Sequence, residues 1–432
     1  MGSGKTSWAI EYMRSHPEEK FLYVTPYITE IIRILNEVRG AKEPTNNNCS
    51  KTEDLKRLLT EKRNIILCTH ELFIRFDREI RELVITGEYT IIMDEALQAI
   101  SPYQSSWHRH SPDSDPYITF DDDNDNIVYL QSKCSIEVDD EDYILWTDDE
   151  ADSLHLREPF YKEIRKLALD HRLIYVHQKY PVVVYPHDIF LECKKAYIMT
   201  YLFEASIMHY YFCIFKINYL KKSISKINGK YQLVEFYMPD TSLYQRLIEI
   251  VDNSVFRRKL HVSNTALSST WSKNARRNNE AGKTLKRIQC NFINCINNRW
   301  NTNESSQSLL WTCIGKNAQK LLSRKGIMNC FESVNCRGTN NYINVKYMGY
   351  FANIYMNVSV KKYIESKDLQ VNENSYALCE MLQFIWRGCI RRGDLLTIYI
   401  PSPRMRNLLC NWLGIDFIPE PKRVMMLKAN KT

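Results

Sequence analysis

The sequence predicts an α/β protein with two parallel-sheet units, and three observations support this prediction. Short β-branched or aromatic runs alternate with helical patterns over residues 7–100, and the alternation returns from residue 308 onward. A stretch of different composition separates the strands of the first unit. Such alternation is typical of parallel strands joined by helices. We expect a first unit at 1–205 with an insertion at about 101–190, a basic intervening region at 206–300 and a second unit at 301–432.

The first unit is expected to begin with a helix at Ser7–Ser15. Apolar residues at helical spacing from Ile28 to Val38 predict a second helix, which Gly40 ends. Pro26 separates this helix from the first strand-like run. Four such runs occur in this unit, at Phe21–Thr25, 64–73, 89–97 and 196–206.

Residues 101–190 are rich in Asp, Pro and Tyr and contain two acidic clusters, Asp121–Asp125 and Asp139–Asp142. Short apolar runs between the clusters predict a partly β insertion. The clusters lack the ligand spacing of a metal site, so they indicate solvated surface.

The first six residues, MGSGKT, match the closing half of a phosphate-binding loop. Backbone N–H groups of such a loop bind phosphate oxygens, the Lys reaches the β/γ-phosphates, and the hydroxyl residue holds Mg²⁺. The first Gly of the full pattern GxxxxGK(S/T) falls before Met1, so we expect the natural start to lie upstream or the chain to be a fragment. The expected nucleotide-binding residues are Gly2, Ser3, Gly4, Lys5 and Thr6.

The run TIIMDEA at 90–96 is the expected partner of this loop. Its buried apolar residues would carry Asp94 to the carboxyl edge of a parallel sheet. There Asp94, with Thr6, would bind Mg²⁺ and Glu95 would orient a water molecule. Loop and strand together predict a nucleoside triphosphatase.

The positive charge is concentrated in the C-terminal half. Residues 206–432 contain 34 Lys and Arg against 14 Asp and Glu, whereas residues 1–205 contain 24 against 37. A half this basic attracts polyanions, so we expect nucleic acid as a partner, DNA rather than RNA. A solvated basic face without a ligand is the alternative.

The composition excludes some classes. No apolar run is long enough for a membrane span, and the N-terminus has no signal-peptide order. The 13 cysteines form no CxxC pair, which favours reduced thiols and a cytoplasmic location, the host cytoplasm if the chain is phage-encoded.

Ser375–Arg392 is expected to be one helix. Leu378, Met381 and neighbouring apolar residues share one face, and Gln383, Arg387 and Arg391 lie four apart on the opposite face. If this face lies opposite the phosphates of the first unit, the arginines supply charge for the γ-phosphate in the transition state.

The order of these motifs resembles superfamily 2 helicases, the DEAD/DEAH-like group with two RecA-like domains, particularly phage-encoded members. The resemblance implies two RecA-like P-loop NTPase domains, with ATP and Mg²⁺ bound by MGSGKT and by Asp94–Glu95. Thr200 would couple hydrolysis to domain movement, and the catalytic residues would be Glu95, Gln383, Arg387 and Arg391. Because the family spacing after Gln383 reaches Ile390, Arg391 or Arg392 must serve as the second arginine. The implied nucleic-acid contacts are Thr25, Pro26, Thr69, Arg337 and Thr339.

The function expected from the sequence is therefore an ATP-dependent nucleic-acid helicase or translocase. Two alternatives stay open. A phage DNA-packaging ATPase also pairs such a loop with an Asp–Glu strand, but the carboxylate-poor residues 301–432 offer no nuclease. A non-catalytic nucleic-acid-binding protein would follow if the incomplete loop does not bind nucleotide productively.

Overall fold

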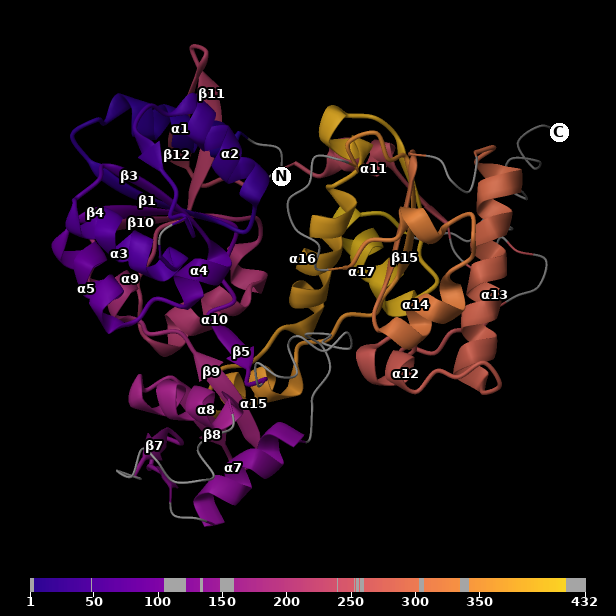
Figure 1. The fold of residues 1–432 in the computed structure, drawn as a ribbon. Helices are drawn as coiled ribbons and strands as arrows, with labels where there is room; N and C mark the ends of the chain where they lie inside the picture. Colours follow the sequence, from indigo (N-terminus) through magenta and orange to yellow (C-terminus); the bar gives the residue numbers. More distant parts are fainter. Residues whose placement is uncertain are drawn as a thin grey trace.

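The computed structural model describes residues 4–47, 49–104, 122–132, 135–147, 159–238, 240–251, 253, 256, 260–302, 307–334 and 342–416. Its first unit is built on a five-stranded parallel sheet of order β10-β4-β1-β3-β2 (Figure 1). Because all pairs are parallel, the carboxyl ends of the strands meet at one edge. The strands are β1 (Lys20–Thr25), β2 (Ala41–Lys42), β3 (Ile65–Thr69), β4 (Tyr89–Asp94) and β10 (Lys195–Met199).

Both faces of this sheet are covered, as expected for a parallel sheet. Leu22 and Val24 face one core cluster, and Phe21 and Tyr23 face another. Helices α1 (Lys5–Ser15) and α2 (Ile28–Glu37) cover the face that carries Tyr23. The opposite face packs against α3 (Lys51–Thr60), α4 (His70–Ile74), α5 (Arg78–Thr86), α9 (Asp188–Glu192) and α10 (Ile207–Ile214).

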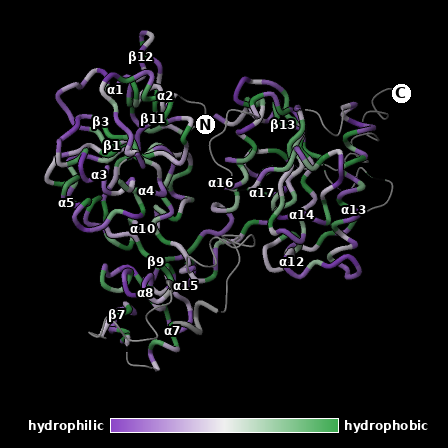
Figure 2. The backbone as a smooth tube through the Cα atoms, viewed as in Figure 1, coloured by the Kyte–Doolittle hydropathy of each residue, from purple (hydrophilic) through white to green (hydrophobic). Residues whose placement is uncertain are grey.

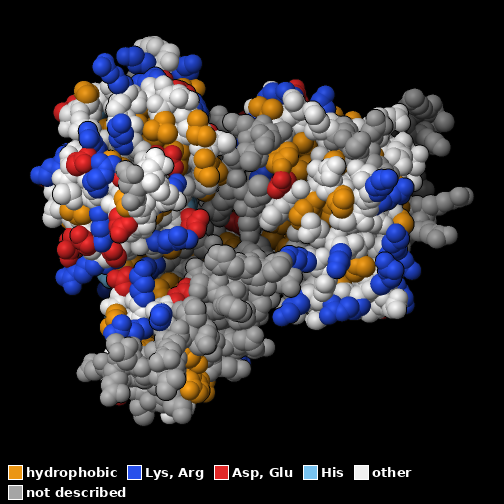
Figure 3. All heavy atoms as spheres, in the orientation of Figure 1, with side chains coloured by type: hydrophobic (Ala, Val, Ile, Leu, Met, Phe, Trp, Pro, Cys, Tyr) orange, Lys and Arg blue, Asp and Glu red, His pale blue; other side chains and the backbone are white. Residues whose placement is uncertain are grey.

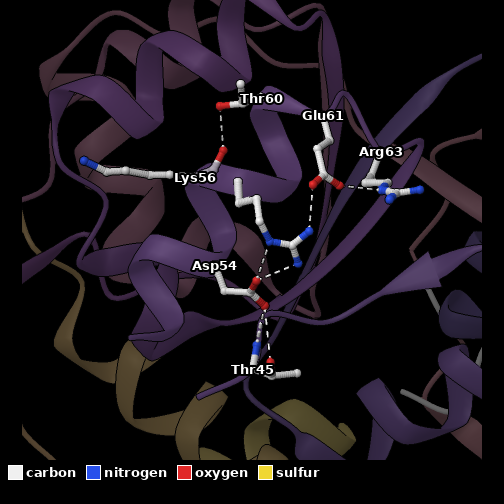
Figure 4. A network of polar contacts seen from close by, with 7 residues as sticks. Thr45, Asp54, Lys56, Thr60, Glu61 and Arg63 are labelled. Carbon is white, nitrogen blue, oxygen red and sulfur yellow. Dashed lines mark hydrogen bonds and ion pairs between the residues drawn. The ribbon is translucent and has the colours of Figure 1, made fainter. Parts of the chain in front are cut away.

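A polar network holds α3 in place (Figure 4). The buried carboxylate of Asp54 accepts hydrogen bonds from the Thr45 backbone N–H at 2.8 Å and from Arg57 Nη2 at 2.7 Å. These contacts, the backbone N–H first, lower the pKa of Asp54. Ser50 and Glu53 add a capping box at the start of α3. The loop after β2 is thereby tied to the helix.

The expected insertion is a small subdomain below the first unit (Figure 1). A three-stranded antiparallel sheet of order β5-β9-β8 forms its base, with a β6–β7 hairpin beside it. Helix α15 of the second unit packs on this sheet. Its elements are β5 (Ile100–Pro102), α7 (Asp122–Ser132), β6 (Ile136–Val138), β7 (Ile144–Trp146), α8 (Pro159–Leu169), β8 (Leu173–Val176) and β9 (Tyr180–Val184).

The second unit has a four-stranded parallel sheet of order β13-β16-β15-β14. Its strands are β13 (Ile248–Val251), β14 (Leu309–Cys313), β15 (Tyr347–Phe351) and β16 (Leu396–Tyr399). The sheet thus takes a strand from residues 206–300, the segment expected to be an intervening region. Its helices are α11 (Ser242–Leu247), α12 (Ser269–Lys273), α13 (Glu280–Asn294), α14 (Lys316–Leu322), α15 (Val358–Ser366), α16 (Glu373–Ile385) and α17 (Pro403–Leu413).

Residues 222–235 form a hairpin of β11 (Lys222–Ile227) and β12 (Lys230–Glu235) that stands beside α1 (Figure 1). The backbone N–H of Tyr231 donates to Glu11 Oε2 at 2.9 Å. A segment between the two units therefore braces the first helix of the chain.

The two parallel-sheet units and the insertion confirm the predicted fold class. Hydrophobic residues gather along the central strands of both units (Figure 2). One core cluster runs from the first unit through the insertion into α15 and α16. Among the described residues, no helix combines the length and apolar character needed to cross a membrane.

Candidate nucleotide site between the two units

Strand β4 delivers Asp94 to the carboxyl edge of the first sheet. Asp94 is only 6% exposed and lies in register with Met199 of β10. Burial raises the pKa of Asp94 to about 7, and the charges of Glu95 and Glu30 act in the same direction. Lys5 and a hydrogen bond with Thr25 lower this pKa. Asp94 is thus a buried carboxylate with too little positive charge around it.

The backbone at Asp94 is held by a side chain from the start of α4, beyond the end of β3. His70, which follows β3, places Nε2 at 2.9 Å from the Asp94 carbonyl oxygen. Because a carbonyl only accepts, Nε2 carries the proton in this contact. His70 thereby positions the strand end that presents the carboxylates.

Glu95 has a left-handed backbone conformation, with φ of 65°. For a residue other than glycine, such a conformation costs about 1–3 kcal/mol and is found at functional sites. The Glu95 N–H donates to the Met199 carbonyl at 3.2 Å, and Thr200 Oγ1 donates to Glu95 Oε2 at 3.2 Å. Thr200, the expected coupling residue, therefore orients the expected catalytic carboxylate.

A cavity of about 250 Å³ opens beside Glu95, between the first unit and α16. Glu95, Gln98 and Thr200 line it from the first unit, and Glu380 and Gln383 line it from α16. The structure thus brings together three predicted residues from distant parts of the chain: Glu95, Thr200 and Gln383.

The phosphate-binding pattern lies at the start of α1. Gly4 is the residue before the helix and has φ of 80°, a left-handed conformation. A Cβ built on Gly4 would lie 2.2 Å from a ring carbon of Tyr231. Lys5 and Thr6 form the first helical turn, where N–H groups attract anions. Gly2 and Ser3 lie outside the described residues.

We expect Gly4→Ala to weaken nucleotide binding by tenfold or more and to lower the melting temperature. Alanine is strained at the positive φ of this position, and its methyl group would clash with the Tyr231 ring. Binding is measured with a fluorescent nucleotide and stability by thermal unfolding. Combining Gly4→Ala with Tyr231→Ala should recover part of the stability, because only the clash is relieved. Equal binding by Gly4→Ala and parent would contradict the prediction.

The residues near Asp94 fit a nucleotide with Mg²⁺. The Tyr23 hydroxyl is buried, and the Thr6 side chain lies close enough to act on it. Burial, followed by the charges of Asp94 and Glu30, raises the pKa of Tyr23 well above its usual value, and Thr6 opposes this. The buried carboxylate of Asp94 and the hydroxyl of Thr6 are oxygen ligands of the kind that Mg²⁺ takes, and Mg²⁺ needs few protein ligands beside water and phosphate. No cluster of three or more metal-ligating side chains occurs in the described part of the chain.

The prediction of a single helix at Ser375–Arg392 was wrong. Helix α16 ends at Ile385, and a short 3-10 helix follows at Cys389–Arg392. The chain turns at Gly388, where a Cβ would lie 2.9 Å from the Val345 carbonyl oxygen. Cys389 N–H then donates to the same carbonyl. Pairing with the neighbouring chain segment therefore ends the helix that the apolar spacing predicted.

As a consequence, the two arginines do not share a face with Gln383. Arg387 is buried in the second unit and donates to the carbonyls of Ser333 and Val334, each at 3.2 Å. Arg391 is exposed, and its Nε donates to the Trp386 carbonyl. Neither lines the cavity, so their catalytic role stays a prediction.

We expect Arg387→Ala to lower the melting temperature by several degrees and Arg391→Ala to leave it nearly unchanged. Arg387→Ala removes two hydrogen bonds from a buried charged group and leaves two carbonyls without donors. Thermal unfolding of both variants measures the difference. Equal melting temperatures would show that Arg387 does not hold the loop at residues 333–334.

The expected nucleic-acid contacts lie in several environments. Thr25 is fully buried, and its Oγ1 accepts from the Tyr27 N–H at 3.3 Å. Thr69 caps α4 by accepting from the Leu72 N–H at 3.2 Å, and Pro26 is partly exposed. Arg337 and Thr339 lie outside the described residues. Thr25 and Thr69 therefore already have local structural partners.

Sequence reasoning missed several residues of this site. Tyr23, Glu30 and Tyr231 face Asp94 or Gly4, and Glu380 lines the cavity. Strict alternation along β1 places Tyr23 on the face of Thr25, so this residue was detectable. Tyr231 gave no local signal, because its position depends on contacts with α1 at the far end of the sequence.

Fold and site together define an α/β protein of two parallel-sheet units with a polar cavity between them. The model of a family described as "YonV C-terminal Rossmann-like domain" matches residues 242–413, which include β13. The SPbeta prophage-derived uncharacterized protein YonV of Bacillus subtilis (strain 168) is 30% identical over 426 residues. The match covers 96% of this chain and 97% of that protein. The chain belongs to the YonV family.

Three solved structures are also similar, each with 14% identity. The structure of S. tokodaii Xpd4 has a TM-score of 0.48 and covers 96% of this chain and 92% of its own. Structures described as XPD helicase and XPD apo have TM-scores of 0.44 and 0.47. The match with XPD helicase covers 97% of this chain and 94% of the matched chain. The match with XPD apo covers 95% of this chain and 93% of the matched chain. Because the identity and the TM-scores are this low, the function is argued from the residues of the site alone.

Proposed function

We propose that this chain is an ATP-dependent nucleic-acid helicase or translocase that hydrolyses ATP between its two RecA-like units. One observation carries the proposal: Glu95 and Thr200 of the first unit and Gln383 of the second line one cavity. An ATPase that responds to domain movement needs catalytic groups from both sides of such an interface.

Each residue has a role that follows from its position. Lys5 and the N–H groups at the start of α1 bind the phosphates. Thr6 and Asp94 would hold Mg²⁺. Mg²⁺, when bound, supplies positive charge that offsets the charge of the phosphates. Glu95, oriented by Thr200, positions the attacking water.

Contacts across the interface offer a path for coupling. The Asn372 N–H donates to the Tyr210 hydroxyl at 2.9 Å, and Cys379 Sγ donates to the Tyr201 carbonyl at 3.6 Å. Tyr201 directly follows Thr200, so a shift of α16 is transmitted to the residue that orients Glu95. Arg337, Thr339, Arg387 and Arg391 remain proposed contributors to nucleic-acid contact and catalysis.

The test is ATP hydrolysis by the full chain, alone and with single-stranded DNA, duplex DNA or RNA. A second protein, extended upstream of Met1, is measured in parallel. We expect stimulation by nucleic acid and loss of hydrolysis in Lys5→Ala. Lys42→Ala, which removes an exposed charge from the edge strand β2, serves as the matched control. If neither protein hydrolyses ATP with any nucleic acid, or if Lys5→Ala is as active as Lys42→Ala, the proposal is wrong.

The same measurements separate the two alternatives. A non-catalytic nucleic-acid-binding protein would bind DNA or RNA but show no hydrolysis in either form. A packaging-type ATPase would respond to duplex DNA alone and show no strand separation on a forked duplex. The cavity favours neither alternative.

A further inference from the structure

Helices α12, α13 and α14 form a strongly basic surface on the side of the second unit away from the first (Figure 1). Residues 269–294 and 316–325 contain ten Lys and Arg and a single carboxylate, Glu280. Glu280 pairs with Lys283 at 2.9 Å. We call this surface the basic face. Its exposed members include Lys273, Arg277, Lys283, Arg287, Lys320 and Lys325.

The basic face differs from the rest of the surface. Lys and Arg side chains gather over α12 to α14, whereas basic and acidic side chains are mixed over the first unit (Figure 3). None of the large exposed hydrophobic side chains of the described residues lies in 269–294 or 316–325. Protein interfaces usually bury aromatic or aliphatic anchors, and membrane-surface helices insert apolar residues. A polyanionic backbone requires neither.

Polar contacts hold the three helices in a fixed arrangement. Asn317 Nδ2 on α14 donates to the Lys273 carbonyl at 2.9 Å. Gln289 on α13 is buried, and its Nε2 donates to the Leu322 carbonyl at 2.8 Å, at the end of α14. The charges are therefore presented by a pre-organised frame, which reduces the entropy lost on binding.

The spacing of the charges suits a phosphate backbone. Lys283 and Arg287 lie four residues apart on the same side of α13, about 6 Å along the helix axis. Successive phosphates of one DNA strand rise by about 3.4 Å along its axis. Cations on α13 can thus meet phosphates that are two steps apart, while Arg277 and Lys320 extend the contact to the neighbouring helices.

We propose that the basic face binds the phosphodiester backbone of nucleic acid, away from the cavity between the units. The basic face would be an anchor for the nucleic acid, and it contains none of the residues expected to contact the strand. The inference rests on the proposed function in its choice of nucleic acid as the polyanion. It does not depend on ATP, so binding is measured without nucleotide.

The test compares two triple variants of the full chain by fluorescence anisotropy over a range of salt concentrations. Arg277→Ala/Arg287→Ala/Lys320→Ala removes three exposed cations of the basic face. Lys42→Ala/Lys179→Ala/Lys194→Ala removes three exposed cations of the first unit and its insertion, so net charge is matched. Thermal unfolding checks that both variants are folded.

We expect the basic-face variant to bind at least about tenfold more weakly than the control at low salt. For this variant, the slope of the logarithm of the binding constant against the logarithm of the salt concentration should be less steep by about 2.7 on duplex, or by about 2.1 on single strands. The size of the change identifies the form of nucleic acid that the basic face binds. Equal affinity and slope in the two variants would overturn the inference. So would loss of binding to phosphatidylserine vesicles with nucleic-acid binding unchanged.

The outcome is independent of the ATPase result. If neither the chain nor the protein extended upstream hydrolyses ATP, but the basic-face variant loses nucleic-acid binding, the proposed function is refuted and the anchor is supported. If nucleic acid stimulates hydrolysis but the basic-face variant binds as tightly as the control, the proposed function is supported and the anchor is refuted.

Discussion

Replacing Glu95 by Gln is expected to lower the rate of ATP hydrolysis by about 10²- to 10⁴-fold, the range that a positioned general base contributes. Gln keeps the size of the side chain and can still accept from Thr200 Oγ1, but it cannot take a proton from water. Nucleotide affinity should stay close to that of the parent, because Glu95 does not contribute to the phosphate-binding loop.

The measurement is steady-state phosphate release together with fluorescent-nucleotide binding. Glu18→Gln, at an exposed position in the turn after α1, is the matched control and should retain full activity. Thr200→Val should show a smaller loss than Glu95→Gln, since it removes only the donor that orients the carboxylate. Hydrolysis by Glu95→Gln within threefold of the parent would exclude Glu95 as the base.

Replacing Asp94 by Asn is expected to stabilise the nucleotide-free chain at neutral and alkaline pH. The pKa of Asp94 is raised from 3.8 to about 7. Such a shift corresponds to about 4 kcal/mol, since one pKa unit is about 1.4 kcal/mol. The expected gain therefore approaches this size above pH 7 and comes at the expense of the expected metal ligand.

The sign follows from proton binding. Because the folded pKa is raised, the folded chain keeps the Asp94 proton over the window from about pH 4 to pH 7, whereas the unfolded chain loses it. The stability of the parent is therefore greatest below pH 4 as far as this group is concerned, and it falls as pH rises to 7. The amide of the Asp94→Asn variant has no such proton, so the difference between variant and parent should grow across this window.

Chemical denaturation of both proteins at pH 4.5, 6 and 8 measures this difference, without nucleotide or Mg²⁺. Asp140→Asn, at an exposed position, is the control and should show a constant difference from the parent. If the difference for Asp94→Asn does not increase between pH 4.5 and pH 8, the carboxylate is not held in the destabilised state that its burial implies.

The edge of the first sheet was largely predictable. Thr25, Thr69, Asp94 and Thr200 each end an apolar run, and parallel strands place such ends at one edge. The same local logic predicted a helix directly after the glycine turn, at Ser7–Ser15, and in the structure this helix begins two residues earlier, at Lys5. It did not reveal that Thr25 and Thr69 have partners of their own, because those hydrogen bonds depend on the turns that follow each strand.

The second unit was harder to predict. Strand β13 is short, and only its pairing with β16 shows that it belongs to the sheet. Helical spacing continues past Ile385, but the close approach of Gly388 to Val345 ends the helix there. Arg387 consequently points to the loop at residues 333–334 and not to the cavity.

By itself, the sequence determined the alternation of strands and helices, the glycine turn before α1 and the strand that presents Asp94 and Glu95. These features depend on neighbouring residues, through side-chain alternation and the conformational freedom of glycine. Tertiary structure alone decided that Gln383 lines the same cavity as Glu95, that Tyr231 covers Gly4 and that three helices form one basic face. Those contacts join residues that lie far apart in the sequence, and they depend on how the sheets and helices pack.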